Sequence, residues 1–248
     1  MGERLSLDDF WSSASSADTV FGSAQIENLP NVVRRYLTHT IAPGTRLARA
    51  VRLRMHGEIK LKAWASFRAE EVIRSDRGLI WQARVLMKGL PVTGYDRFID
   101  GVGEMHWKLL GIIPIIKAFG ADITRSAAGR FAAESVWLPS ILLSPNASWT
   151  GRDSNVASVA LNAGGHSAEM EFVLDEGGRL RNTSMQRWGN PEGGEFHSVR
   201  FGAIVEDEST FGGYTIPTKL RIGWYFGTKQ FETEGEFFRC TVDDATFR

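Results

Sequence analysis

The sequence predicts an α+β, mainly β fold, in which a single large antiparallel sheet of about 10–12 strands curves into a half-barrel or open barrel. Two or three helices are expected to pack on or in this sheet. The prediction depends on three observations: many short runs alternate apolar and polar residues, short turns rich in Gly, Asn and Asp join them, and few windows have helical spacing. Strands that alternate with crossover helices, as a parallel sheet requires, are absent from the pattern.

One domain is expected to span residues 1–248, because no linker, composition change or internal repeat divides the chain. Residues 1–25 mix charged and Ser-rich sequence, which predicts a loosely ordered or short helical extension. The first helix is predicted from Asn28 to Ile41, with Asn28 as its N-cap and Pro30 in its first turn. A Pro-Gly pair shortly after Ile41 ends it.

After this helix the hydrophobic period changes to two. Leu47, Val51 and Leu53 belong to one alternating set, and Arg52 and Arg54 belong to the other, as in a strand with one wet face. Together with the strands that follow, this segment indicates an antiparallel meander joined by short turns. The four further strands of this half are predicted at 63–75, 79–87, 92–100 and 103–110.

The run from Leu109 to Phe119 interrupts the regular pattern. Its first eight residues are the most apolar stretch of the chain and include Pro114, and they are far fewer than the roughly 20 residues that span a bilayer. The segment could form a lid at the mouth of a cavity or a buried plug. The buried plug is the preferred interpretation.

A second helical window runs from Asp122 to Leu143, with helical spacing kept until Pro139 restricts the chain. The pattern of strands and turns then resumes and continues to the C-terminus. The strands of this second half are predicted at 147–149, 156–162, 168–174, 179–187, 195–207, 216–226 and 231–243.

The strand patterns give the predicted sheet one dry face. Near the C-terminus, for example, Leu220, Ile222 and Trp224 share one face of a strand, and Lys219 and Arg221 share the other. Two or three helices cover only about four or five strands, at about 10 Å per helix and about 4.8 Å per strand. The uncovered dry face indicates either a concavity for an apolar ligand or an interior filled by the chain's own side chains.

Composition and motifs exclude several classes of function. The 29 basic and 29 acidic side chains leave no basic excess for nucleic acid or for an anionic membrane surface. Cys240 is the one cysteine, the five histidines lack metal-ligand spacing, and no glycine-rich phosphate loop precedes a helix. We therefore predict no metal, no cofactor, no nucleic-acid partner and no catalytic residue. The absence of a signal-peptide pattern and of a transmembrane stretch predicts a cytoplasmic location.

One carboxylate in the second helical window stands among apolar positions. Glu134 lies four residues after Arg130, and a buried carboxylate needs a partner. Arg130, Arg187 or a backbone amide could supply a structural ion pair, or Glu134 could be the polar anchor of a ligand pocket. Four tryptophans supply the aromatic positions of such a pocket. The predicted ligand-binding residues are Trp81, Trp107, Glu134, Trp137, Arg187 and Trp224.

Three motifs resemble the pattern of a bacterial family of unknown function. They are GVGEMHWKLLGIIP at 101–114, AESVWLP at 133–139, and FGGYTIPT at 211–218 followed by Gly223 and Trp224. Membership would imply the fold of that family, and it would assign no catalytic residue. The strand-rich layout is also similar to the cupped sheets of lipoprotein carriers of the LolA and LppX type, which hold acyl chains in an apolar concavity.

These observations favour a non-enzymatic protein that binds an apolar or amphipathic small molecule, such as a fatty acid or lipid, in the concavity of a curved sheet. The first alternative is an enzyme that uses a carboxylate in the same cavity, with Glu134 and Asp153 as candidates. The second is a filled-core scaffold whose surface binds protein, which a cavity smaller than about 300 Å³ would favour. No oligomeric state is predicted.

Overall fold

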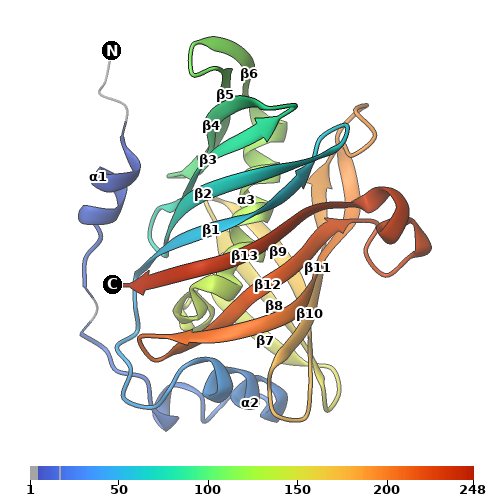
Figure 1. The fold of residues 1–248 in the computed structure, drawn as a ribbon. Coiled ribbons are helices and arrows are strands. Elements are labelled where there is room, and N and C mark those ends of the chain that lie inside the picture. The colour runs from blue at the N-terminus through green and yellow to red at the C-terminus, as the bar shows by residue number, and fades with distance from the viewer. Residues whose placement is uncertain (1–4, 17) are drawn as a thin grey trace.

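A single curved antiparallel sheet forms the body of the protein (Figure 1). The computed structural model describes residues 5–16 and 18–248, and over these residues the sheet has thirteen strands. The strands of the first half are β1 (Ala50–Lys60), β2 (Trp64–Arg74), β3 (Gly78–Met87), β4 (Leu90–Ile99), β5 (Val102–Leu109) and β6 (Ile113–Phe119). Those of the second half are β7 (Ala147–Gly151), β8 (Val156–Ala163), β9 (His166–Leu174), β10 (Leu180–Gly189), β11 (His197–Phe211), β12 (Tyr214–Trp224) and β13 (Glu236–Phe247).

The strand order is β6-β5-β4-β3-β2-β1-β13-β12-β11-β10-β9-β8-β7, and each neighbouring pair is antiparallel. Two meanders, one from β1 to β6 and one from β7 to β13, are joined where the first strand pairs with the last. Strands β6 and β7 remain as the outer edges, so the sheet is a half-barrel. The predicted fold class is confirmed.

The chain between the two edges of the sheet crosses its concave side. Helix α3 leads from β6 towards β7 and contacts β4 and β5 on one side and β8, β9 and β10 on the other (Figure 1). No helix among the described residues combines the length and apolar composition needed to cross a membrane. The helices are α1 (Leu7–Ser12), α2 (Asn31–Thr40) and α3 (Ala121–Ala133), with the short helices η1 (Ser23–Gln25), η2 (Glu134–Trp137), η3 (Pro139–Leu143) and η4 (Phe231–Gly235).

The two N-terminal helices lie outside the concavity. In α1, Phe10 packs with Val72 of β2 and Ile80 of β3 in a small separate core on the outer face of the sheet. Helix α2 contacts β7, β8 and β12 at one end of the half-barrel (Figure 1). It starts later than the sequence indicates, because Pro30 has an extended ψ of 148° and the helix begins after it. Residues 1–4 of the predicted extension lie outside the described residues.

The preferred interpretation of 109–119 as a buried plug is wrong. The segment supplies β6, an edge strand paired only with β5 among the described residues. Its apolar side chains are exposed rather than buried: Ile112 is 75% exposed and Ile113 is 49% exposed. The continuous apolar run lacks the period of two that marks a half-buried strand, so the pattern gave no signal for a strand exposed on both faces.

The phenol of Tyr214 ties the segment before β1 to the start of β12. Its hydroxyl donates to Arg46 O at 2.7 Å and accepts from Ala48 N–H at 2.7 Å. The ring is 1% exposed and stacks on Phe247 of β13, with 4.1 Å between ring centroids. This buried pair of hydrogen bonds therefore helps to fix the junction of the two meanders.

Replacing Tyr214→Phe keeps the ring stack and leaves the Ala48 N–H and the Arg46 carbonyl without their partner. We expect the free energy of unfolding to fall by about 1–3 kcal/mol, the usual cost of a buried polar group left unsatisfied. Urea denaturation followed by circular dichroism measures it. An unchanged free energy of unfolding would show that the hydroxyl does not stabilise the junction.

Candidate ligand-binding cavity

A cavity of about 330 Å³ lies between helix α3 and the concave face of the sheet. Its wall is mainly apolar and comes from both meanders. Met55, Leu79 and Met105 line it from the first, and Leu220 and Ile222 line it from the second. The volume is at the low end of the range for ligand sites. The chain therefore leaves part of its dry face uncovered, as the excess of strands over helices indicated.

Five of the six predicted ligand-binding residues line this cavity: Trp81, Glu134, Trp137, Arg187 and Trp224. The sixth does not line it. The indole N–H of Trp107 instead donates to Oδ1 of Asp96, a cavity residue, at 2.8 Å. The structure brings the predicted set together around one space, and their part in binding a ligand stays a prediction.

Arg130 of α3 is the centre of a buried ionic cluster at this cavity. Its Nε donates to Glu134 Oε1 at 2.6 Å, and its Nη1 donates to Asp96 Oδ2 at 2.9 Å. Its Nη2 lies 3.5 Å from Oε1 of Glu71, which is fully buried. The guanidinium also lies over the ring of Trp81, 5.0 Å from its centroid. Of the partners considered from the sequence for Glu134, the structure selects Arg130.

The register of the sheet explains how these groups meet. Glu71 of β2 is opposite Trp81 of β3, which is opposite Asp96 of β4. Each occupies a position of the dry face, where apolar residues are expected. Glu71 was missed from the sequence, although its alternation with Phe67, Ala69 and Ile73 could have revealed it as a charged residue on that face. A buried charge of this kind requires a partner, and Arg130 provides one.

Burial raises the pKa of Glu71 well above its ordinary value, and the nearby charge of Glu134 adds to the effect. Burial also raises the pKa of Asp96, although the charge of Arg130 opposes the rise. For Arg130, burial alone would lower the pKa, but the surrounding carboxyls raise it above its ordinary value. The cluster thus holds one permanent cation among carboxyls that do not ionise equally.

Arg187 of β10 is placed differently. Its guanidinium lies 4.6 Å from the ring centroid of Phe201 and 5.2 Å from that of Trp224. Its Nε and Nη2 point to the carbonyl of Ser126 at 3.4 and 3.3 Å, which are long hydrogen bonds. Among the described residues no carboxylate forms an ion pair with it. A cation in the cavity wall is therefore held by aromatic rings and one carbonyl.

The pKa of Arg187 reflects this environment. Burial, followed by the charge of Arg130, lowers the pKa of Arg187 to about 10. Gly129 allows close packing here, because a Cβ there would make a tight contact of 3.2 Å with Arg187 Cγ. The packing of α3 on β10 thus leaves a buried guanidinium that an anionic group would stabilise.

Other candidates from the sequence do not assemble. Asp153 is on the exposed turn between β7 and β8, where its carboxylate accepts the N–H groups of Asn155 and Val156, each at 2.8 Å. Of the two carboxylates considered for the enzyme alternative, Glu134 lines the cavity and Asp153 does not, and the carboxyls near Glu134 are Glu71 and Asp96. No group of three or more metal-ligating side chains is found in the part of the chain that the structure describes.

Comparison with known proteins gives a family and a general likeness. A model described as a family of unknown function (DUF6544) matches residues 19–234, which agrees with the motifs quoted above. No curated protein matches the chain in sequence.

Two solved structures are similar to this chain. One is described as an outer membrane lipoprotein-sorting protein domain from Vibrio parahaemolyticus, with 8% identity, a TM-score of 0.46, and coverage of 88% of this chain and 91% of that one. The other is a LolA superfamily protein from Nitrosomonas europaea, with 10% identity, a TM-score of 0.42, and coverage of 88% and 92%.

The raised pKa of Glu71 predicts how stability changes with pH. The folded protein keeps the Glu71 proton to a higher pH than the unfolded chain, where the ordinary value is 4.5. Between these two pKa values the unfolded chain binds fewer protons, so the free energy of unfolding falls as pH rises, by at most about 1.4 kcal/mol per pH unit for one group. The Glu71→Gln variant has no carboxyl to titrate at this position, so its free energy of unfolding should fall less steeply as pH rises.

Urea denaturation at pH values from about 4 to about 8 measures the free energy of unfolding over this range. A range of about four pH units is wide enough to follow the titration of one group. The control is Glu70→Gln, because the neighbouring Glu70 is paired with Arg52 on the outer face. If the free energy of unfolding changed with pH in the same way in wild type and in Glu71→Gln, the raised pKa of Glu71 would be contradicted.

Proposed function

The chain belongs to this family of unknown function, and we propose that it binds a small acidic amphiphile in the cavity. The acidic head group would pair with the guanidinium of Arg187, and a single acyl chain would lie along the apolar wall. The proposed role is binding rather than catalysis. The ligand class is that of a free fatty acid or a lipid with one exposed chain.

The observation that carries the proposal is the state of Arg187. It is the cavity guanidinium that lacks a carboxylate partner among the described residues, whereas Arg130 has three carboxyls around it. A buried cation without a counter-ion is costly, and an anionic ligand that supplies one gains a charge-assisted hydrogen bond. Burial, followed by the charge of Arg130, also lowers the pKa of Arg187, although the charges of Glu134 and Asp96 oppose this.

An unsatisfied donor on Trp81 also supports an acidic or carbonyl-bearing head group. Trp81 lines the cavity, and its buried indole N–H has no hydrogen-bond partner among the described residues. Buried tryptophans usually find an acceptor for this group. An oxygen atom of a ligand would accept a hydrogen bond from this N–H group. In a filled core, a further side chain would have to provide the acceptor.

The apolar wall supports an acyl chain as the other end of the ligand. Ile59, Phe237 and Phe238 line the cavity where it approaches the ends of β1 and β13. Each methylene that leaves water for such a wall contributes about 0.8 kcal/mol. A cavity of about 330 Å³ accommodates a chain of short or medium length, so decanoate is a suitable probe.

The cavity volume also bears on the filled-core alternative. It is slightly above the value of about 300 Å³ at which ligand pockets begin, and its lining includes charged groups that a filled core would avoid. These features support a ligand site over a scaffold with a closed interior.

We expect the Arg187→Met variant to bind decanoate about tenfold to a hundredfold more weakly than wild type. The loss corresponds to a hydrogen bond between charged groups, about 1.5–3 kcal/mol. Replacing a buried charge with a side chain of similar shape is often neutral for stability, so the variant should still fold. Isothermal titration calorimetry measures the dissociation constants.

Two controls separate the head group from the chain. Arg200→Gln removes a guanidinium of β11 that is paired with Glu171 outside the cavity, and it should bind decanoate as wild type does. Decylamine has the same chain and the opposite charge, and it should bind wild type more weakly than decanoate. Equal affinity of wild type and Arg187→Met for decanoate would contradict the proposed anchor, and no binding to wild type would reject the ligand class.

A further inference from the structure

The lysines of the chain are gathered at one end of the first meander. Four of the seven are in or beside the turns that join β1 to β2, β3 to β4 and β5 to β6, and a fifth, Lys117, lies further along β6, opposite His106 of β5. Because β1, β3 and β5 run in the same direction, these three turns lie at the same end of the sheet (Figure 1). We call this end the lysine rim and define it as residues 59–63, 86–91 and 108–117. Its lysines are Lys60, Lys62, Lys88, Lys108 and Lys117.

The lysine rim is also where the exposed aliphatic residues are. Over the described residues, the exposed large hydrophobic side chains outside the rim are Val20, Val102 and Phe119. Ile112 at the tip of the β5–β6 hairpin is the most exposed, at 75%. Such a concentration on a protein of this size marks an interaction surface. The exposed members within the rim are Leu61, Leu86, Leu90, Leu110, Ile112, Ile113, Ile115 and Ile116.

The rim contains no acidic residue. The stretches 59–69, 83–95 and 105–121 hold no Asp or Glu, although the whole chain has as many acidic as basic side chains. None of the five rim lysines forms an ion pair with a described carboxylate, and Lys60 donates only to Thr233 O, at 3.2 Å. The rim segments therefore carry only basic charged side chains, although Glu232 and Glu234 flank the Thr233 that Lys60 contacts, and the exclusion of anionic membrane surfaces on total charge does not hold for the rim.

The rim lies beside the part of the cavity wall that is partly exposed to solvent. Ile59, which lines the cavity, directly precedes Lys60, and it pairs in register with Phe238, another cavity residue. Both side chains are partly exposed, as are Phe237 and Trp224 of the same wall. The cavity therefore reaches towards solvent on the side of the lysine rim.

We propose that the lysine rim docks the protein on the surface of an anionic lipid bilayer. The aliphatic side chains of the turns and of β6 would enter the boundary between head groups and acyl chains, and the lysines would contact the anionic head groups. Membrane-surface segments combine these two features, apolar side chains for insertion and lysines for anionic lipid. Docking would cover the exposed edge strand β6 and bring the cavity close to the lipid.

Charge complementarity favours a bilayer over a second copy of the chain. Two identical rims would bring ten lysines together without a carboxylate, because the symmetric contact uses the same patch twice. Like charges placed opposite one another are unfavourable. An anionic bilayer offers both the counter-charges and the apolar layer.

Vesicle co-sedimentation tests the proposal. Wild type should bind vesicles of an equimolar mixture of phosphatidylglycerol and phosphatidylcholine, and should not bind phosphatidylcholine alone. High salt should weaken the binding, because it screens the lysines. The Lys60→Gln/Lys62→Gln/Lys117→Gln variant should bind on the order of a hundredfold more weakly, at about fivefold per lysine. The Ile112→Ser/Ile113→Ser variant should bind more weakly by about tenfold per isoleucine.

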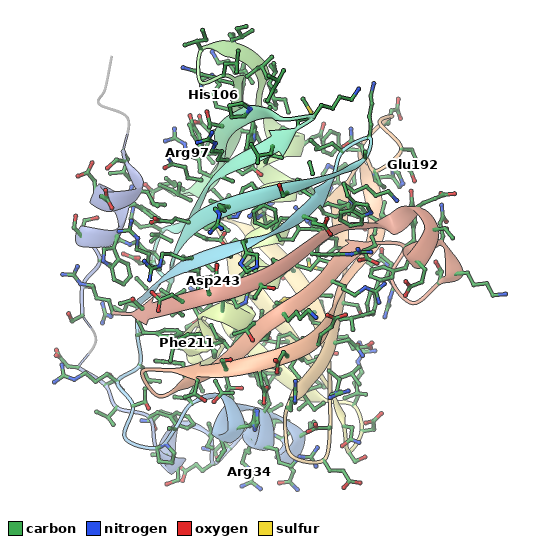
Figure 2. The ribbon with its side chains drawn as sticks, in the orientation of Figure 1. Arg34, Arg97, His106, Glu192, Phe211 and Asp243 are labelled. Carbon is green, nitrogen blue, oxygen red and sulfur yellow. The ribbon has the colours of Figure 1, made fainter. Side chains whose placement is uncertain are left out.

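Two control variants carry the same numbers of substitutions as the rim variants, at positions outside the rim. Arg34→Gln/Arg181→Gln/Lys219→Gln removes three exposed positive charges elsewhere, one of them from Arg34 at the opposite end of the molecule from His106 of β5 (Figure 2). Val20→Ser/Val102→Ser removes two exposed aliphatic side chains outside the rim. Both controls should bind anionic vesicles as wild type does, and the rim variants should still bind soluble decanoate.

Docking and cavity binding can fail separately. Loss of vesicle binding in the rim variants with normal decanoate binding would support docking whatever the cavity holds. Failure of wild type to bind anionic vesicles, or equal binding by wild type and both rim variants, would overturn the proposal. A dimer that dissociates in Ile112→Ser/Ile113→Ser, seen by sedimentation velocity without any vesicle binding, would also overturn it and make the rim an interface between copies.

Discussion

The contact between Arg130 and the carboxyls of Glu71, Asp96 and Glu134 holds α3 against the concave face of the sheet. The sheet provides more dry surface than one helix covers, so the position of that helix decides what stays open. An ionic contact inside a protein is costly to desolvate and gives little net stability. Its value here is geometric: it ties the Arg130 side chain of α3, a helix that also packs on β10, to β2 and β4, and the cavity lies beside this cluster, lined also by β12.

The same cluster makes two of the cavity arginines unequal. Arg130 is compensated by carboxyls, whereas Arg187 has aromatic faces and the Ser126 carbonyl around it. A cavity with a cation that has no ion-pair contact at one place and an apolar wall at another suits a ligand with an acidic head group and an apolar chain. The outer surface has a related asymmetry, because the lysine rim concentrates cations and aliphatic residues at the end from which the cavity is approached.

The sequence predicted the sheet and its curvature, because alternation along a strand directly reports which side chains share a face. Five of the six residues proposed for a pocket line the cavity. The sequence did not predict β6, since an edge strand exposed on both sides has no alternation to detect. It offered Asp153 as a cavity carboxylate beside Glu134, whereas register brings Glu71 and Asp96 to the cavity instead. Register across strands and the path of α3 depend on long-range packing, which no local pattern contains. Total charge, likewise, carries no information on where the lysines gather.

A crystal structure with a brominated medium-chain fatty acid tests the central claim most directly, because bromine reports the position of the chain independently of the protein. The account predicts the carboxylate within ion-pair distance of the Arg187 guanidinium and the bromine between α3 and β12, near Leu220 and Ile222. A fatty acid bound elsewhere, or a carboxylate turned away from Arg187, would contradict it. So would an interior closed by side chains with no ligand between α3 and the sheet.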